Sequence, residues 1–161
     1  MSERKRGGLD RFLAHARAKG FEDPGVREFP EGTKTAQDAA RAIGCEVGQI
    51  VKSVVLVADG EPVVALTSGA NRVDMLEVAR ILGAEDVRKA NADQARDATG
   101  YAIGGTPPFG YPRPVRVLMD RDLHAFEEVW AAAGTPFSVF PISPQALEEA
   151  AGGEPADFKE T

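Results

Sequence analysis

The sequence predicts a single mixed α/β domain built on a mixed, largely antiparallel sheet. The chain has 161 residues, 43% of them hydrophobic and 27% charged, which suits one ordinary core and argues against disorder. Short strand-like runs are interspersed with short helical runs, without the regular βαβ alternation that builds a parallel sheet. An Asp-Gly pair between two apolar runs is typical of a β-hairpin.

The N-terminal part of the chain predicts two helices and one short strand. Apolar residues recur at helical spacing near the start, so residues 1–24 are assigned to an N-terminal helix with a basic tail. A short strand is expected at residues 26–29. Thr35 is a favourable N-cap and Gly44 a favourable end for a helix between them.

The Asp-Gly pair at residues 59–60 separates two runs that are rich in valine. Residues 50–58 and 62–67 therefore predict the two strands of a hairpin. A helix is expected after the hairpin, with an end at Gly83. Its inward-facing residues are predicted to be Val73, Leu76, Ala79 and Leu82.

The second half of the chain alternates strands with two capped helices. A strand is expected near residues 86–89, followed by a helix that Asn91 and Gln94 begin as a capping box. Two further strands and a last helix are predicted at residues 115–119, at residues 138–140 and from Ser143 onward, where Pro144 is the first helical residue.

These elements assemble into one domain at residues 25–151, and residues 152–161 are expected to be an acidic, flexible tail. No apolar run reaches the roughly 20 residues that span a bilayer, and no apolar segment follows the basic start, so neither a membrane nor a secretory signal is expected. The single cysteine, Cys45, fits a reducing cytoplasm.

The charge is uneven along the chain. Residues 1–20 carry six Lys/Arg and two Asp/Glu, while the whole chain has a net charge of −6, so the body of the protein is acidic. An acidic body argues against a broad grip on nucleic acid, and DNA is not an expected partner. A small site that holds one nucleic-acid end remains compatible with this charge.

The usual catalytic side chains are scarce. The two histidines, His15 and His124, lie in no recognisable catalytic motif. The sequence has no HExxH, CxxC or GxSxG pattern, so neither a metal, a cofactor nor a serine triad is expected. If the protein is an enzyme, positioning and backbone electrostatics must supply most of the rate.

Lys52 is the most informative residue. It lies inside a strand-like run and shares one strand face with Ile50, Val54 and Leu56. An ammonium group is almost never buried without a partner, because its desolvation is costly. Lys52 therefore either reaches water along its stem or faces a cleft where an anion binds.

The segment Gly100–Pro112 holds four glycines and three prolines in thirteen residues. Such a long turn-rich loop in a small domain is usually functional, although a structural loop is the alternative. Glycine allows a ligand to approach the main chain closely, and proline fixes the shape of the loop. A second polar loop, Ser68–Asn71, precedes a helix and predicts either an anion site or plain capping.

Six motifs together resemble the YbaK/EbsC family, which is similar to the editing insertion domain of bacterial prolyl-tRNA synthetase. The resemblance runs from about Phe29 to Leu147. The motifs are GTKTAQDAA, IVKSVV, SGANRVD, GYAIGGTPPFG, AAGTP and SPQAL. The fold that the resemblance implies is a partly barrel-like mixed sheet surrounded by helices.

The resemblance also implies a trans-editing deacylase that hydrolyses mischarged aminoacyl-tRNA in the cytoplasm without a cofactor. Its lysine, which engages the terminal adenosine, maps onto Lys52, and its ester-binding GxxxP element maps onto Gly104–Pro108, with Gly104 and Gly105 in catalytic positions. The substrate-binding residues that follow are Thr106, Pro107, Pro108, Ser68, Asn71, Gly134, Thr135, Thr33, Lys34 and Asp120. The expected partners are the aminoacyl-tRNA 3′ end and an aminoacyl-tRNA synthetase.

Two alternatives differ from this interpretation in class. One is a binding module that holds a nucleotide or a tRNA end, or docks on a synthetase, without catalysis. The other is a hydrolase of small aminoacyl esters, which competition by tRNA would distinguish. Some alanine-editing relatives use a histidine near the segment that reads Gly134-Thr135-Pro136-Phe137-Ser138 here, and this chain has none in that segment.

Overall fold

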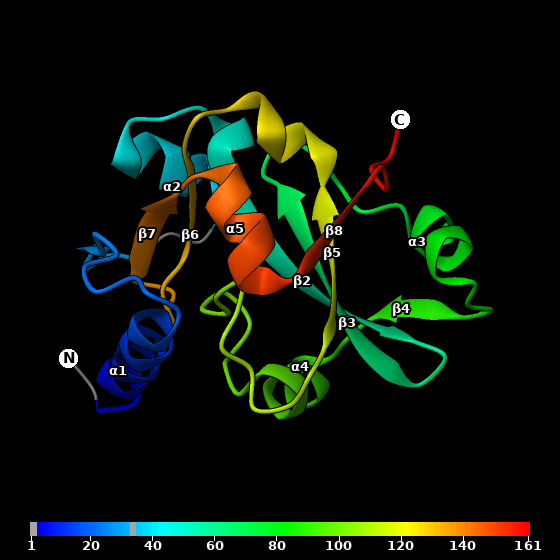
Figure 1. Ribbon diagram of the computed structural model, residues 1–161, viewed down its shortest axis with the longest axis horizontal. Helices are drawn as coiled ribbons and strands as arrows, with labels where there is room; N and C mark the ends of the chain where they lie inside the picture. Colours follow the sequence, from blue (N-terminus) through cyan, green and yellow to red (C-terminus); the bar gives the residue numbers. More distant parts are fainter. Residues whose placement is uncertain (1–2, 33–34) are drawn as a thin grey trace.

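A mixed sheet organises the computed structural model, which describes residues 3–32 and 35–161. The described residues form eight strands in the order β1-β7-β6-β2-β3-β5-β8, with β4 paired to β2 beside this path (Figure 1). The strands are β1 (Arg27–Glu28), β2 (Ile50–Ala58), β3 (Glu61–Ser68), β4 (Val87–Lys89), β5 (Arg116–Asp120), β6 (Val129–Ala132), β7 (Ser138–Ile142) and β8 (Gly153–Ala156). Four of the pairings are antiparallel and three are parallel, which confirms the predicted mixed sheet.

Helices cover both faces of this sheet. They are α1 (Glu3–Ala18), α2 (Ala36–Ile43), α3 (Met75–Leu82), α4 (Ala92–Thr99) and α5 (Pro144–Ala151), with short 3₁₀ helices at Val47–Gln49 and Arg121–Ala125. None of the described helices has the length and apolar character that crossing a membrane requires.

The two faces of the sheet carry separate hydrophobic clusters. Val55, Leu66 and Met119 lie on one face, in the cluster that includes buried residues of α1, α4 and α5. Leu56 and Leu118 lie on the other face, in a cluster with α3. At the Ile50 end of this second face a third, smaller cluster packs against α2. The alternation of side chains along β2 therefore separates the two layers.

Strand β2 is unusual because its two edges are paired differently. One edge pairs with β3 without interruption from Val51 to Ala58. The other edge pairs with β6 at Ile50 and Val51, and then with β4 from Leu56 onward. Between these two partners, the stretch from Lys52 to Val55 faces no strand. The main sheet is thus split on one side of its central strand.

Local signals in the sequence explain most element boundaries. Thr35 Oγ1 accepts a hydrogen bond from the Asp38 N–H at 3.0 Å, which confirms the predicted N-cap of α2. Asn91 and Gln94 form the predicted capping box of α4. Asp59 and Gly60 have φ values of 49° and 85°, so both adopt the left-handed conformation that a tight hairpin turn requires.

The phase of α3 differs from the expectation. Leu76 was expected to face inward, but it is 82% exposed, and Val78 is the fully buried residue. The reason is that Val73 lies outside the helix, in an antiparallel bridge with Lys159, and Asp74 caps the helix through the N–H of Leu76. The helix therefore begins later than the apolar pattern suggests, and its inward face shifts.

The prediction that residues 152–161 form a flexible tail is also wrong. Residues 153–156 form β8, which pairs in parallel with β5 at the edge of the sheet. Phe158 follows the strand and is 1% exposed in the same cluster as Val78. Composition misled the prediction, because a short edge strand with a proline resembles a loop while its pairing partner lies far away in sequence. Strand β6 was not predicted either.

We predict that Phe158→Ala lowers the free energy of unfolding by about 3–5 kcal/mol, because it leaves a cavity in a packed cluster. Urea unfolding followed by circular dichroism measures the change. Leu76→Ala is the matched control and should change stability by less than about 0.5 kcal/mol, since its side chain is exposed. Equal effects of the two substitutions would contradict a packed C-terminal segment.

Candidate functional site

A pocket of about 360 Å³ opens where β2 has no partner strand. Its lining comes from the edge of β2, from the start of α2 and from the glycine-rich loop. The lining residues are Thr35, Ala36, Ala39, the stretch 50–55, Lys89, Ala90, Ile103, Gly104, Thr106, Trp130, Ala132 and Val139. The structure therefore brings together Lys52, Gly104 and Thr106, three of the predicted site residues.

Strand register explains which side chains project into this pocket together. Trp130 is aligned with Ile50, and Lys89 is aligned with Leu56. Aligned residues share a face, so Lys52, Lys89 and Trp130 all project from the side of the sheet that α2 and α3 cover. The pocket combines two ammonium groups with one large aromatic ring.

Lys52 is partly buried and has one defined partner. Its Nζ donates a hydrogen bond to the main-chain carbonyl of Asn71 at 2.6 Å. Burial lowers the pKa of Lys52 below its ordinary value, the charge of Arg72 lowers it further, and Asp120 opposes the shift. Among the described residues, no ion pair involves Lys52, Arg72 or Lys89. Their positive charge is therefore available to an anion.

The main chain of β2 is itself exposed to the gap. The Ile50 carbonyl accepts from the Gly69 N–H on the β3 side, and the Val55 carbonyl accepts from the Ala90 N–H on the opposite side. Backbone groups alternate along a strand, so the N–H and C=O of Ser53 point into the opening between β6 and β4. The pocket thus has a main-chain donor and acceptor of β2 next to Lys52.

The glycine-rich loop approaches this opening in a fixed shape. Gly104 adopts a φ of +91° at the pocket wall, a conformation that glycine tolerates best. A Cβ on Gly105 would lie 2.8 Å from the Cα of Thr135, so only glycine fits against that main chain. The loop is braced internally, since Thr106 Oγ1 donates to the Ala102 carbonyl at 3.1 Å.

Four other predicted residues support the loop and do not line the pocket. Pro107 and Pro108 are buried, and the Pro107 carbonyl accepts a hydrogen bond from the Tyr111 hydroxyl at 2.7 Å. Thr135 Oγ1 lies 2.7 Å from Ser138 Oγ and accepts from the Phe137 N–H. Gly134 has a φ of +99° and lies against the main chain of Gly8 in α1. The pocket wall beside them is Ala132 and Val139.

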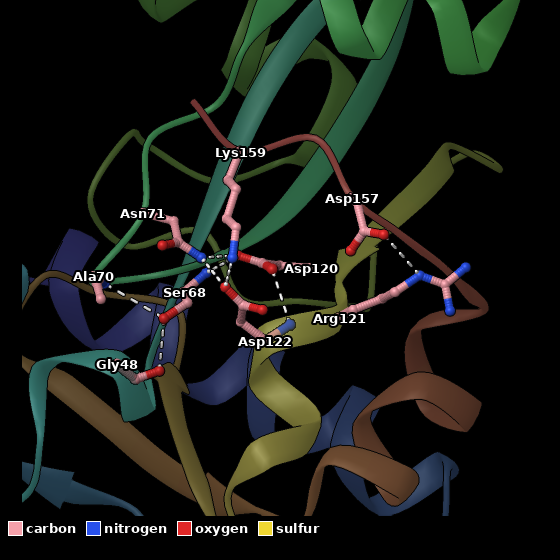
Figure 2. A network of polar contacts seen from close by, with 9 residues as sticks. All are labelled: Gly48, Ser68, Ala70, Asn71, Asp120, Arg121, Asp122, Asp157 and Lys159. Carbon is pink, nitrogen blue, oxygen red and sulfur yellow. Dashed lines mark hydrogen bonds and ion pairs between the residues drawn. The ribbon is translucent and has the colours of Figure 1, made fainter. Parts of the chain in front are cut away.

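Ser68, Asn71 and Asp120 form a polar network near the ends of β3 and β5 (Figure 2). Asp120 is 3% exposed, and its Oδ2 accepts from the Ser68 N–H at 3.1 Å and from Asn71 Nδ2 at 2.8 Å. Ser68 Oγ donates to the Gly48 carbonyl at 2.8 Å. These polar atoms are already partnered, so the network shapes the loop after β3 and does not line the pocket.

The remaining candidates lie elsewhere. Thr33 and Lys34 lie outside the described residues, while Thr35 next to them lines the pocket. His124 Nε2 lies 2.9 Å from Glu148 Oε1 and does not line the pocket. Within the described ranges, no group of three or more His, Cys, Asp or Glu side chains is arranged to hold a metal ion.

Sequence reasoning missed Trp130, Lys89 and Ile103 as lining residues. Trp130 lies on the unpredicted strand β6, and its sequence signal was that it is the single tryptophan of the chain, next to small apolar residues. Lys89 ends the short strand expected near residues 86–89 and had no signal of its own as a site residue. Ile103 belongs to the glycine-rich loop and is 53% exposed at the pocket.

Comparison with known proteins gives a consistent picture. The model of the family "Aminoacyl-tRNA editing domain" matches residues 30–150. The chain is 29% identical over 125 residues to the uncharacterized protein YwhH of Bacillus subtilis, covering 77% of this chain and 79% of YwhH. It is 37% identical over 92 residues to the proline–tRNA ligase of Citrifermentans bemidjiense, covering 57% of this chain. That match spans only 16% of the ligase.

A solved structure is similar over the whole chain. The crystal structure of a candidate trans-editing enzyme for prolyl-tRNA synthetase superposes with a TM-score of 0.91 at 40% identity. The alignment covers 100% of this chain and 99% of the other, so it includes the sheet, the pocket and the C-terminal strand.

We predict that Gly105→Ala destabilises the fold by about 1–3 kcal/mol, because its methyl group would overlap the main chain of Thr135. Gly7→Ala in α1 is the control, since nothing lies within 4 Å of a Cβ there, and it should leave stability unchanged or raise it. Thermal unfolding measures both variants. A Gly105 variant as stable as the wild type would show that the two loops are not in contact.

Proposed function

Because the chain belongs to the aminoacyl-tRNA editing domain family, we propose that it is a trans-editing hydrolase that deacylates mischarged aminoacyl-tRNA. The substrate is tRNA-Pro, or a similar tRNA, that carries a small wrong amino acid. The similarity to proline–tRNA ligases and to a candidate trans-editing structure supports this choice of tRNA. Its place of action is the cytoplasm, where charged tRNA is used.

One observation carries the proposal: Lys52 and Gly104 line the same pocket at an open strand edge. An ammonium group at the wall suits a phosphate or ribose of the terminal adenosine. The glycine-rich loop lets an ester approach the main chain closely. The Ser53 N–H and C=O add a donor and an acceptor at the same edge. A charged anchor next to a main-chain wall fits the 3′ end of an aminoacyl-tRNA.

The chemistry follows from what the pocket lacks. Among its described lining residues, there is no His, Cys, Asp or Glu to act as nucleophile or general base. We infer that water attacks the ester carbonyl directly, forming a C–O bond, and that the bond from this carbon to the ribose oxygen breaks. The attacking water gives up a proton, and the neighbouring ribose hydroxyl relays it to the departing oxygen. Backbone groups position the ester and stabilise the oxyanion.

The charge distribution supports a small contact with tRNA. The whole chain has a net charge of −6, while Lys52 and Lys89 line the pocket and the charge of Arg72 acts on Lys52. None of these three forms an ion pair with another residue that the structure describes. Such a surface favours the end of the acceptor arm over a long stretch of backbone. An aminoacyl-tRNA synthetase is the proposed protein partner, because it releases the charged tRNA that this protein would inspect.

We predict that Lys52→Ala lowers the rate of deacylation by about 100-fold or more, because the substrate end loses its charged anchor. The assay uses proline tRNA charged with alanine, cysteine or serine, with correctly charged tRNAs for comparison. Lys19→Ala is the control, since Lys19 lies over the ring of Phe109 outside this pocket. If the wild type and Lys19→Ala hydrolyse one of these esters and Lys52→Ala does not, that ester is the substrate. Absence of turnover on every ester would favour a binding module.

Trp130 allows binding to be measured without catalysis. It is the single tryptophan of the chain and it lines the pocket, so adenosine 5′-monophosphate should change its fluorescence. Lys52→Ala should weaken this binding about tenfold, as for the loss of one charge-assisted contact. Lys19→Ala should bind as the wild type does. A titration without any fluorescence change would place the nucleotide elsewhere.

A further inference from the structure

The last residues of the chain close over the loop that follows β3. We call residues 157–160 the C-terminal clasp. Lys159 forms an antiparallel bridge with Val73. The Asp74 N–H donates to the Phe158 carbonyl at 2.7 Å, and the Glu160 N–H donates to the Arg72 carbonyl at 2.8 Å. The clasp therefore pairs with the main chain of residues 72–74 like a short extra strand.

The side chain of Lys159 continues this contact toward the pocket. Its Nζ lies 2.7 Å from Asp122 Oδ2, and the same oxygen accepts from Asn71 Nδ2 at 2.8 Å (Figure 2). The Asn71 carbonyl, at the other end of this residue, accepts from Lys52 Nζ at 2.6 Å. An unbroken series of polar contacts thus runs from the C-terminal clasp to the lysine of the pocket.

The side-chain amide of Asn71 is held between two carboxylates that differ in solvent exposure. Asp120 is buried, and its Oδ1 accepts from the Asp122 N–H at 3.0 Å. Asp122 is partly exposed, and the hydrogen bond from Lys159 is the largest cause that lowers its pKa, followed by the one from Asn71. Two carboxylates so close would repel each other. The Lys159 ammonium offsets that repulsion at Asp122, so both carboxylates accept hydrogen bonds from the one Asn71 amide.

We propose that Lys159 is a positioning residue for Lys52, acting through Asp122 and Asn71. This inference rests on the proposed function of the pocket. With Lys159 in place, the Asn71 carbonyl is fixed and sets the direction of the Lys52 ammonium. Without Lys159, Asp122 loses its counter-charge, and Asp120 becomes the main partner of the Asn71 amide. The Lys52 ammonium then samples several positions.

The ion pair itself contributes little to the fold. The side chains of Lys159 and Asp122 are 42% and 41% exposed, and such pairs are weak in water. The main-chain contacts of the clasp and the burial of Phe158 do not pass through the Lys159 ammonium. Lys159 can therefore be changed without unfolding the domain, so an effect on activity is separable from an effect on stability.

The kinetic test compares Lys159→Gln with the wild type on the mischarged tRNA that the wild type hydrolyses. We expect kcat to fall about tenfold, with KM changed less than about twofold, because misplacement of a positioned group by even 1 Å is costly. Lys159→Arg should restore most of kcat, since a guanidinium can also pair with Asp122. A wild-type kcat in Lys159→Gln would overturn the proposal.

Arg121→Gln is the matched control. Arg121 Nε lies 3.5 Å from Asp157 Oδ2, with side chains that are 59% and 74% exposed, so it is a second ion pair to the same clasp. This pair makes no contact with Asn71 (Figure 2). Arg121→Gln should keep the wild-type kcat. An equal loss of kcat in both variants would contradict the positioning role, because it would show that Lys159 only holds the C-terminal clasp in place.

A second readout does not depend on catalysis. In ¹⁵N-lysine-labelled protein, the Lys52 ammonium should give a resolved signal, protected from exchange by its bond to the Asn71 carbonyl. Lys159→Gln should broaden or lose that signal while Arg121→Gln keeps it. An unchanged signal in Lys159→Gln would overturn the positioning role. If no tRNA were hydrolysed by any form, the proposed function would fail, and this comparison would still decide the positioning.

Discussion

The interrupted edge of β2 is the constraint on which the rest of the structure depends. A central strand with full pairing on both edges would have the main-chain N–H and C=O groups of its middle residues engaged within the sheet. Here the partners β6 and β4 cover only the two ends of that edge. The gap between them leaves space for the pocket beside Lys52 and exposes the main chain of Ser53.

Close approach of backbone segments fixes the wall opposite Lys52. Gly105 packs against the main chain of Thr135, and the neighbouring Gly134 packs against Gly8 in α1. Three segments far apart in sequence are thus stacked with no side chain between them. Glycines recur in the loop for two reasons. Some give the wall its shape, as Gly104 does with its positive φ, and others allow main-chain segments to touch.

The charged groups are divided between two sides of Lys52. Lys89 and Trp130 share its pocket, while Asp120, Asp122 and Lys159 form the network behind it. The carboxylates stay out of the pocket, where they would repel an anionic substrate, yet they are near enough for Asp120 to favour the charged form of Lys52. The C-terminal segment completes this second layer, so the end of the chain takes part in the architecture of the site.

Local signals in the sequence determined the helix caps at Thr35 and Asn91 and the Asp59-Gly60 turn, because each depends on neighbouring residues. The order of short strands and helices predicted the class of the sheet. Local signals also singled out Lys52 and the glycine-rich loop, since a lysine inside an apolar strand and a long turn-rich loop are both uncommon in a small domain. Only the tertiary structure decided the phase of α3, the pairing of β8, the place of Trp130 in the pocket and the internal role of Ser68 and Asp120. These features depend on contacts between segments distant in sequence, where the partner, and not the local pattern, determines which face is buried and which polar atom is free.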